Sequence, residues 1–503
     1  MLATLRSAAV LGINASVVDV QVDISDSGLP TFAIVGLPDS TVRESRERIR
    51  SALENANYPF PLRRIIVNLA PADTPKSGAS FDLPIALGLL TAMGCLPPEG
   101  FEQTLVVGEL SLDGRVQAAH GVLPVALLAA RLGHHLVLPA TNVPEARIVD
   151  GVELIPAQGL VQTIRDLKNG TRTADPLPDV APVRRDGCPL DLSDVQGQLG
   201  ARRAAEIAAA GRHNLLMIGP PGAGKTLIAR RIPGLLPPPT FAEASAVTSI
   251  HSVAGLLDPS AGLLSDRPFR APHHTASVSA LIGGGRDPRP GEISLAHAGV
   301  LFLDEMVEFD RRVLEALREP LEEGAVRVAR ALRTVRFPAR FLLVGAMNPC
   351  PCGYAGEPSG RCRCTPSEVR HYSDRISGPL RDRIDLTVRV DPVPFEALAR
   401  EAAAESSADV RARVNEARER QATRDRTGTG RTNADLSGEA LKRHGALDPS
   451  GLALVEQAMN RLGLTGRSFD RVRRVARTIA DLDGADGIRR AHIVEALHYR
   501  GID

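Results

Sequence analysis

The stretch Gly219-Pro-Pro-Gly-Ala-Gly-Lys225-Thr226 decides the fold class of this chain. It matches the pattern G-x-x-x-x-G-K-[ST] at every fixed position, follows the apolar run Leu215–Ile218 and opens a helical segment, which is the context of a phosphate-binding P-loop. Glycines let successive backbone N–H groups turn toward phosphate, and the helix N-terminus adds positive potential. The alternative is a glycine-rich turn without a ligand. The residues expected to line the site for ATP are Gly219, Pro220, Pro221, Gly222, Ala223, Gly224, Lys225 and Thr226.

The last two residues of this motif have separate expected roles. The ammonium of Lys225 would reach the β- and γ-phosphates, and the hydroxyl of Thr226 would bind Mg²⁺. Lysine is scarce in this chain, which favours a specific role for Lys225. The 60 Lys and Arg residues include four lysines, at Lys76, Lys168, Lys225 and Lys442.

Two further apolar runs end in polar side chains. Val300–Leu303 leads into Asp304 and Glu305, and Phe341–Met347 leads into Asn348. Because α/β sheets bind ligands at the carboxyl ends of their strands, we expect Asp304 to hold Mg²⁺ and Glu305 to polarise the attacking water. Asn348 is expected to hydrogen-bond the γ-phosphate or that water. Alternatively, it only begins the turn before Pro349.

Arginines between a predicted helix and strand, in Ser377-Gly-Pro-Leu-Arg-Asp-Arg383-Ile-Asp385, are candidates for charge stabilisation in trans. Arg383 is the candidate finger that enters the nucleotide site of a neighbouring subunit, and Arg381 is the second choice. Arg467 and Arg471 begin a helix near the C-terminus, from which either could reach back to the nucleotide. The alternative for each is an ordinary surface arginine.

Length and composition limit the remaining possibilities. The chain has 503 residues, of which 43% are apolar and 24% charged, so we expect an ordinary globular protein of two to four domains. It has no apolar run near the ~18 residues that a membrane span needs, and no evident secretory signal. We therefore expect a cytoplasmic protein with no membrane partner. With a net charge of +1, any nucleic-acid surface must be local.

The order of apolar runs predicts three parts. Residues 1–168 alternate strand runs, including Val17–Ile24 and Ile65–Leu69, with helical runs. Residues 169–189 carry Gly, Pro and charge without apolar periodicity and are the predicted linker. An α/β core is expected over 190–392, and the rest, 393–503, is expected to be helical. The helices predicted there are Glu396–Arg426, Ser450–Leu462, Phe469–Leu482 and Arg489–Leu497.

These motifs resemble a magnesium-chelatase-type AAA+ ATPase, and the whole chain resembles the YifB/ComM family. The segments that carry the narrower resemblance are AVLGINA, IVGLPDSTVRESRERIRSAL, VNLAPAD, FRAPHHTASVSALIGGG, MNPCPCGY and RISGPLRDRIDL. The resemblance implies an N-terminal domain of the Lon-protease/ribosomal S5 domain 2 type, an AAA+ P-loop core and a helical C-terminal lid. It also implies a hexameric, DNA-binding ATPase that promotes branch migration in natural transformation.

The N-terminal part allows a test for Lon-like proteolysis. Pro75-Lys-Ser-Gly-Ala-Ser80-Phe resembles the Lon segment with the nucleophilic serine, which places Ser80 at the serine's position. Where the Lon pattern has its lysine base, this chain has Leu123, Pro124 and Val125. A serine hydroxyl without a base is a poor nucleophile. Lys76 lies on the serine's own loop, so we expect a non-proteolytic scaffold.

Four of the six cysteines lie in one short loop over 350–364, as Cys350-Pro-Cys352 and Cys362-Arg-Cys364 separated by nine residues. In a cytosolic chain such clustering favours a metal over disulfides. Four thiolates suit a structural, tetrahedral Zn²⁺ with no open position, although Cys-x-Cys is tighter than the usual Cys-x₂-Cys. Free thiols or a redox pair are the alternatives.

The segment 327–336 is predicted to form a β-hairpin with an arginine at every third position: Arg327, Arg330, Arg333 and Arg336. In a ring-shaped motor such a hairpin would contact backbone phosphates without reading sequence. His273 and His274 lie in another predicted loop, without a third metal ligand nearby in sequence. Few aromatic residues accompany these basic residues, so base stacking is not supported.

Three functions remain from the sequence. The favoured one is an ATP-driven ring motor on single-stranded or branched DNA, acting as a helicase or in branch migration. The alternative is a chelatase-type ATPase that remodels a protein partner. The third, an ATP-dependent Lon-like protease, is disfavoured by the residues at 123–125. The choice between the first two rests mostly on the family resemblance.

Overall fold

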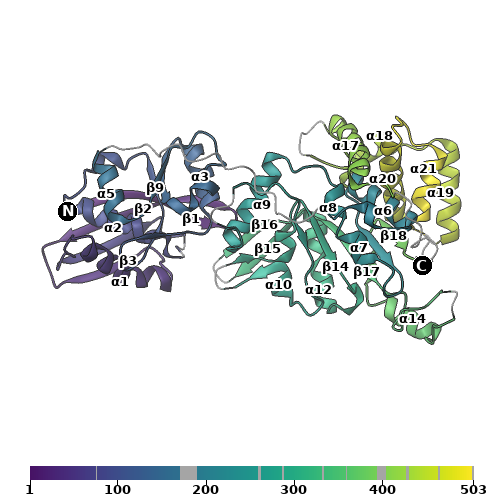
Figure 1. The fold of residues 1–503 in the computed structure, drawn as a ribbon, viewed down its shortest axis with the longest axis horizontal. Helices are drawn as coiled ribbons and strands as arrows, with labels where there is room; N and C mark the ends of the chain where they lie inside the picture. Colours follow the sequence, from purple (N-terminus) through teal and green to yellow (C-terminus); the bar gives the residue numbers. More distant parts are fainter. Residues whose placement is uncertain are drawn as a thin grey trace.

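A computed structural model describes residues 1–74, 76, 78–169, 190–258, 262–285, 288–330, 333–357, 360–393, 404–425, 430–462 and 465–500. The chain is elongated, with an N-terminal α/β region at one end, a second α/β region in the middle and a group of helices at the other end (Figure 1). Of the predicted linker, residues 170–189 lie outside the described part. Among the described helices, none combines the length and hydropathy required to cross a bilayer.

The N-terminal region is built on a mixed seven-stranded sheet in the order β3-β4-β2-β1-β5-β8-β9. Strands β1 and β2 form a long antiparallel hairpin that pairs Leu2 with Asp23 and Leu11 with Asn14. The sequence had not indicated β1, because four of its five buried residues are the small Ala3, Ser7, Ala8 and Ala9. The strands are β1 (Leu2–Leu11), β2 (Asn14–Ser25), β3 (Thr31–Val35), β4 (Arg64–Ala70), β5 (Thr104–Val106), β8 (His135–Pro139) and β9 (Leu154–Ala157).

Helices cover this sheet with apolar faces. In α1, Val42, Ile49 and Leu53 recur at helical spacing and are fully buried. The helix begins at Ser40, because the side chain of Asp39 accepts a hydrogen bond from the N–H of Val42 (2.7 Å) and caps it. The helices are α1 (Ser40–Asn55), α2 (Asp82–Ala92), α3 (Val122–Leu132), α4 (Val143–Ala146) and α5 (Leu160–Asn169), and a short pair, β6 (Glu109–Leu110) and β7 (Val116–Gln117), lies beside them.

The middle region contains a parallel five-stranded sheet in the order β11-β14-β17-β10-β18. Its strands are nearly all apolar, as expected for a sheet covered on both faces. Because the strands are parallel, their carboxyl ends meet at one edge, with β10 flanked by β17 and β18. The strands are β10 (Leu215–Ile218), β11 (Phe269–Arg270), β14 (Val300–Leu303), β17 (Leu342–Met347) and β18 (Leu386–Arg389).

Short helices and two small ribbons complete the middle region. The helices are α6 (Leu199–Gly211), α7 (Lys225–Ala229), α8 (Ile232–Leu235), α9 (Phe241–Ala254), α10 (Val278–Ile282), α11 (Glu292–Leu295), α12 (Arg311–Ala316), α13 (Arg318–Glu323), α14 (Pro366–Ser373) and α15 (Gly378–Arg381). The ribbons are β12 (Gly283–Gly284) with β13 (Arg289–Pro290), and β15 (Ala325–Arg330) with β16 (Arg333–Pro338). The second ribbon confirms the predicted hairpin.

The described C-terminal residues form helices. They are α17 (Ser407–Arg424), α18 (Gly438–His444), α19 (Pro449–Leu462), α20 (Gly466–Leu482) and α21 (Arg490–His498). Ser406 and Asp409 form a capping box, so the first of these helices begins at Ser407. The prediction that this helix already covers residues 404–406, as part of Glu396–Arg426, is therefore wrong. Residues 394–403 lie outside the described part.

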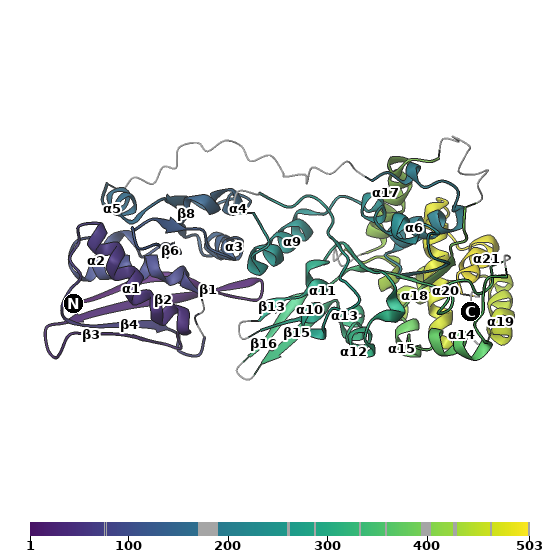
Figure 2. The ribbon, with the colours of Figure 1, turned by 60° about the horizontal axis from the view of Figure 1, so that its bottom comes forward.

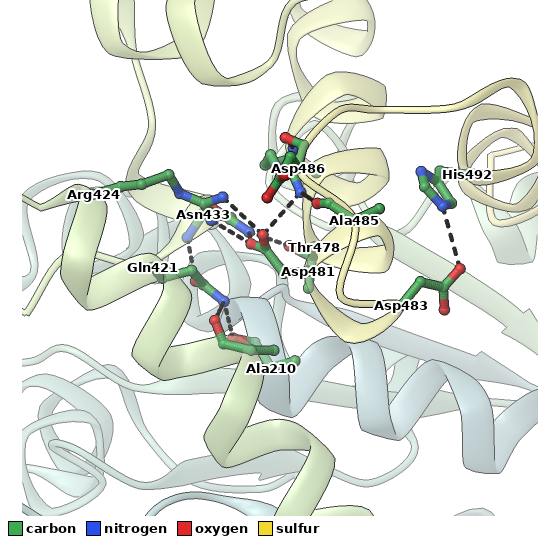
Figure 3. A network of polar contacts seen from close by, with 12 residues as sticks. Ala210, Gln421, Arg424, Asn433, Thr478, Asp481, Asp483, Ala485, Asp486 and His492 are labelled. Atoms are coloured by element: carbon green, nitrogen blue, oxygen red, sulfur yellow. Dashed lines mark hydrogen bonds and ion pairs between the residues drawn. The ribbon is translucent and has the colours of Figure 1, made fainter.

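A buried polar network joins these helices to the middle region (Figure 3). The carboxylate of Asp481 in α20 accepts hydrogen bonds from Arg424 in α17 and from Asn433 (2.7 Å). The amide of Gln421 donates to the carbonyl of Ala210 at the end of α6 (3.0 Å). Oγ1 of Thr478 in turn lies 2.7 Å from Nε2 of His213, two residues before the start of the P-loop strand. The helical region is thereby connected to the base of β10.

The N-terminal and middle regions lie side by side in Figures 1 and 2, and their described residues touch at two places. The turn between β1 and β2 packs on the β15–β16 ribbon, where a Cβ at Gly12 would stand 2.9 Å from Val335. At the second contact, Ser252 in α9 donates to the buried carboxylate of Glu145 (2.5 Å) and accepts from the N–H of Gly121 (2.9 Å). The two regions therefore share both apolar and hydrogen-bonded contacts.

Candidate functional site

The P-loop connects the carboxyl end of β10 to the N-terminus of α7. Gly222 (φ +77°) and Gly224 (φ +93°) adopt left-handed backbone conformations that favour glycine. Gly219 has a different reason to lack a side chain, because a Cβ there would stand 2.1 Å from the carbonyl oxygen of Val390. These three positions explain why the loop can fold back tightly over the helix N-terminus.

The ammonium of Lys225 is held inside this loop, and Lys225 as a whole is only 9% exposed. It donates to the carbonyl oxygens of Gly219 (2.6 Å) and Pro220 (2.9 Å) and to Oδ1 of Asn348 (3.2 Å). Burial lowers the pKa of Lys225, while the charges of Asp304 and Glu305 act in the opposite direction. The structure thus brings Lys225 and Asn348 together at the carboxyl ends of adjacent strands, β10 and β17.

Oxygen atoms suited to Mg²⁺ meet beside this lysine. Thr226 donates its hydroxyl to Oδ2 of Asp304 (2.8 Å), and Oδ1 of Asp304 accepts from the N–H of Glu305 (3.0 Å). A hydroxyl and a carboxylate are hard oxygen ligands of the kind that Mg²⁺ prefers, with phosphate oxygens and water completing its shell. The donor set therefore fits Mg²⁺ bound together with a triphosphate.

Glu305 follows Asp304 in a left-handed conformation (φ +49°), and its side chain is 57% exposed. Nδ1 of His274 lies 3.6 Å from its carboxylate. The sequence had not indicated this contact, because His274 lies about thirty positions upstream. The pairing of β11 with β14, Phe269 opposite Val300, brings the two residues together.

The arginine candidates lie at the amino ends of the strands, at the edge of the sheet opposite the P-loop. Arg383 and Asp385 precede the start of β18, and Asn214, which precedes β10, donates to the carbonyl of Arg383 (2.8 Å). Arg383 also forms an ion pair with Glu322, and burial lowers its pKa, as do the charges of Arg318 and Arg467. The P-loop follows the other end of β10, so Arg383 and Lys225 of one chain lie at opposite edges.

A charged cleft of about 490 Å³ surrounds Arg383, Arg467 and Arg471. Arg467 lies 4.0 Å from Asp382 and its side chain is 76% exposed. Arg471 faces Asp382 (3.7 Å) and Asp385 (3.8 Å). The structure therefore groups Arg467 and Arg471 with Arg383, rather than with the P-loop of their own chain. Arg381, the second choice for the finger, instead donates to the carbonyl of Ser373 (2.6 Å).

Asp385 supplies a buried negative charge to this cleft. Burial alone would raise the pKa of its carboxyl, but the nearby ring of His213 and the charges of Arg471 and Arg500 outweigh burial and lower it. Nδ1 of His213 lies 3.4 Å from this carboxylate. Asp385 is thus a buried anion that fixes Arg471 in the cleft.

The β15–β16 ribbon has two unlike faces. One face is apolar and packs into the middle core through Val326, Val328, Val335 and Phe337. On the other face, exposed Arg327 stands directly opposite exposed Arg336, and Arg327 also pairs with Glu323 (2.6 Å). Arg330 and Arg333 pair at the end of the ribbon; their side chains lie outside the described part.

The four cysteines predicted to bind metal lie together in the loop after β17. The sulfur atoms of Cys350, Cys352, Cys362 and Cys364 all lie within 4.8 Å of one another.

In the N-terminal region, Lys76 is buried and donates to the carbonyl of Pro71. Leu123 and Val125 are buried in α3, so an apolar face occupies the position where the Lon pattern has its base.

Comparisons with known proteins agree with these features. Three family models match: "Magnesium chelatase, subunit ChlI" over residues 191–398, "Subunit ChlI of Mg-chelatase" over 20–142, and "Magnesium chelatase, subunit ChlI C-terminal" over 404–500. Competence protein ComM of Haemophilus influenzae is 44% identical over 510 residues, covering 100% of this chain and 98% of the relative. The chain belongs to the YifB/ComM family of magnesium-chelatase-like proteins.

Two other relatives show the extent of this similarity. YifB of Escherichia coli is 43% identical over 504 residues, covering 100% of this chain and 97% of the relative. The magnesium-chelatase 38 kDa subunit of Cereibacter sphaeroides is 28% identical over 180 residues, covering 32% of this chain and 53% of the relative. Similarity to the YifB/ComM family is therefore end to end, whereas similarity to the chelatase subunit is partial. This family relation and the parallel sheet indicate an AAA+-type ATPase.

Proposed function

We propose that this YifB/ComM family protein is a ring-forming, ATP-hydrolysing motor that acts on single-stranded or branched DNA, in branch migration or as a helicase. The observation that carries the DNA part is the exposed Arg327–Arg336 pair on a ribbon whose other face is buried. Like charges directly opposite each other on a ribbon are destabilising. Phosphates of a nucleic acid would offset that repulsion without reading the base sequence.

The nucleotide chemistry follows from the geometry around the P-loop. Lys225 would exchange its contacts with loop carbonyls for the β- and γ-phosphates, and Asn348 would orient the γ-phosphate or the attacking water. Mg²⁺, held by Thr226 and Asp304, would neutralise charge on the phosphates. Glu305 would polarise the attacking water, and its exposed carboxylate is free to approach it.

Assembly is supported by the separation of Lys225 from Arg383. Phosphoryl transfer is strongly accelerated by an arginine that stabilises charge in the transition state. Because the cleft with Arg383, Arg467 and Arg471 lies at the other edge of the sheet, it can serve only the nucleotide of a neighbouring chain. We propose that this arrangement, in which the arginine cleft of one chain faces the nucleotide of the next, repeats around a hexamer.

The flanking regions have proposed roles in this motor. Residues 1–168 would form a Lon/S5-like scaffold without protease activity, since Leu123 and Val125 are buried and Ser80 has no lysine base at that position. Residues 393–503 would act as a helical lid, connected to the base of β10 through Thr478 and His213. The domain boundaries at 168, 190 and 392 belong to this proposal.

The name of the relative in Haemophilus influenzae, competence protein ComM, supports the DNA assignment. The alternative, remodelling of a protein partner, is favoured by the partial similarity to a chelatase subunit. The two functions differ in whether DNA raises the ATPase rate and whether the protein binds DNA in a salt-dependent way.

The test measures ATPase rate and DNA binding of the full chain with single-stranded and forked DNA over a salt series. We expect stimulation by DNA and binding that weakens as salt rises. Arg327→Ala combined with Arg336→Ala should lower the slope of log affinity against log salt by about 1.4, from about 0.7 per lost phosphate contact on single strands. The matched control is Arg50→Ala, an exposed arginine that pairs with Glu54 four residues later (3.0 Å), as Arg327 pairs with Glu323 four residues earlier. Full ATPase activity without DNA stimulation or salt-dependent binding would instead support protein remodelling.

A further inference from the structure

The segment between β17 and α14 has too few buried residues to hold its own shape. It runs over residues 349–365, and in its described part only Cys350 and Gly353 are buried. Short segments without an apolar core are commonly stabilised by a disulfide or a metal. The question is therefore what orders this loop beside the nucleotide site.

The sulfur positions answer that question geometrically. A tetrahedral ion with four Zn–S bonds of about 2.3 Å requires sulfurs about 3.8 Å apart. The sulfur of Cys350 lies 3.3 Å from that of Cys352 and 3.8 Å from that of Cys362, and Cys352 lies 3.7 Å from Cys362. A disulfide would require about 2.05 Å. The spacing of these three sulfurs is close to that of a tetrahedral site and too long for a bonded pair, and the sulfur of Cys364 lies within 4.8 Å of each of them.

The main chain of the loop also supports four thiolates. The N–H of Ala355 donates to the sulfur of Cys350 (3.3 Å), and the main chain at Tyr354 and Arg363 donates to that of Cys352. Such contacts to the ligand atoms fix their orientation. Soft thiolates select Zn²⁺ or iron over hard ions such as Mg²⁺, and four protein ligands leave no open position for catalysis.

The loop is joined to the P-loop on one side and to β18 on the other. Gly353 (φ +88°) packs so closely on the P-loop that a Cβ there would stand 2.7 Å from Cδ of Pro221. On the other side, Arg389 at the end of β18 donates to the carbonyl of Gly356 (2.6 Å). Cys350 itself follows Asn348 by two residues, so the position of one constrains the other.

We infer that Cys350, Cys352, Cys362 and Cys364 bind one structural Zn²⁺, which holds this loop against Pro221 and thereby keeps Asn348 directed at Lys225. The metal acts as a strut between the P-loop and β17 and takes no part in the reaction. The metal site stands independently of the proposed function, whereas its effect on turnover rests on the proposed ATPase activity.

The experiment determines metal content by mass spectrometry in the full-length protein, purified reduced and without chelators. We expect about one zinc per chain. Cys352→Ser and Cys364→Ser should lose it, and Cys95→Ser, a free cysteine in the N-terminal region, should retain it. Where a variant does not fold, the wild-type protein decides: after zinc removal, cobalt should bind at one equivalent with the spectrum of a tetrahedral thiolate site.

The effect on the nucleotide site is measured separately. Zinc removal should slow ATP turnover about 10- to 100-fold, because small displacements of positioning groups cost rates of that order, and added zinc should restore it. The inference is overturned if the wild-type protein holds no zinc and takes up neither zinc nor cobalt, if it holds iron, or if a folded Cys352→Ser variant keeps full zinc. Unchanged turnover in zinc-free protein would overturn the strut role. Absence of ATPase activity in zinc-loaded protein would instead contradict the proposed function.

Discussion

The contact between Asn348 and Lys225 leads to a quantitative prediction, because charge can be introduced there without a change of shape. In Asn348→Asp, a carboxylate oxygen would replace the amide oxygen that lies 3.2 Å from the ammonium. At that distance two opposite unit charges attract by about 5 kcal/mol with an effective dielectric constant of about 20. A triphosphate must compete with this attraction for the same ammonium.

The size of the effect follows from the exposure of the site. Asn348 is only half-buried, so solvent screens part of the attraction. If half of it, about 2.5 kcal/mol, is lost from nucleotide binding, the Kd for ATP rises about 60-fold. Asn348→Ala introduces no charge and should leave the Kd within about threefold of wild type. Its kcat should fall about 100-fold, the usual cost of one positioned polar group at a developing charge.

The assay is titration of the full chain with a fluorescent ATP analogue and Mg²⁺, followed by single-turnover hydrolysis. Asn55→Asp is the control for added charge, because Asn55 lies in α1 of the N-terminal region, where its amide donates to Leu112 (2.7 Å). If Asn348→Asp binds ATP as tightly as the control, Asn348 does not face the phosphate site and the geometric argument fails.

Three further predictions concern turnover, assembly and stability. Glu305→Gln should bind ATP but turn over about 10²- to 10⁴-fold more slowly, as for loss of a general base; wild-type turnover would remove Glu305 from that role. Arg383→Ala mixed with Lys225→Ala should regain ATPase activity, since each can supply what the other lacks; a mixture that stays inactive counts against action in trans. Burial of Asp82 raises the pKa of its carboxyl to about 6, although Arg48 opposes the rise. The folded state therefore binds the extra proton between pH 4 and 6, and stability relative to Asp82→Asn should fall by about 3 kcal/mol as pH rises through that range. Urea unfolding at several pH values measures this, and a difference that grows with pH would contradict it.

Much of the nucleotide site could be predicted from sequence because its parts are local. The P-loop is one contiguous stretch, and Asp304 and Asn348 each follow a short apolar run of the length typical of a buried strand. The carboxyl ends of parallel strands meet at one edge, so their proximity followed from the fold class. The hairpin predicted over 327–336 is confirmed, since β15 and β16 pair Arg327 with Arg336 and Arg330 with Arg333.

Other features depend on strand order and packing, which the sequence does not encode locally. The contact of His274 with Glu305 requires β11 to pair with β14. Arg467 could have reached either edge of the sheet, and its place beside Asp382 depends on how α20 packs. Strand β1 was missed because small residues on its buried side carry little hydrophobic signal, yet the turn at its end contacts the arginine-bearing ribbon.

By itself, then, the sequence determined the chemistry that the site can perform, because glycines, a lysine and carboxylates at set spacings fix a phosphate loop and its metal ligands wherever the rest of the chain goes. Only the tertiary structure decided which distant groups share that chemistry. It placed Arg383 away from Lys225, brought the four cysteine sulfurs within 4.8 Å of one another and set Gly353 against Pro221. The reason is that these contacts join segments far apart in the chain, whose meeting depends on the packing of the whole core.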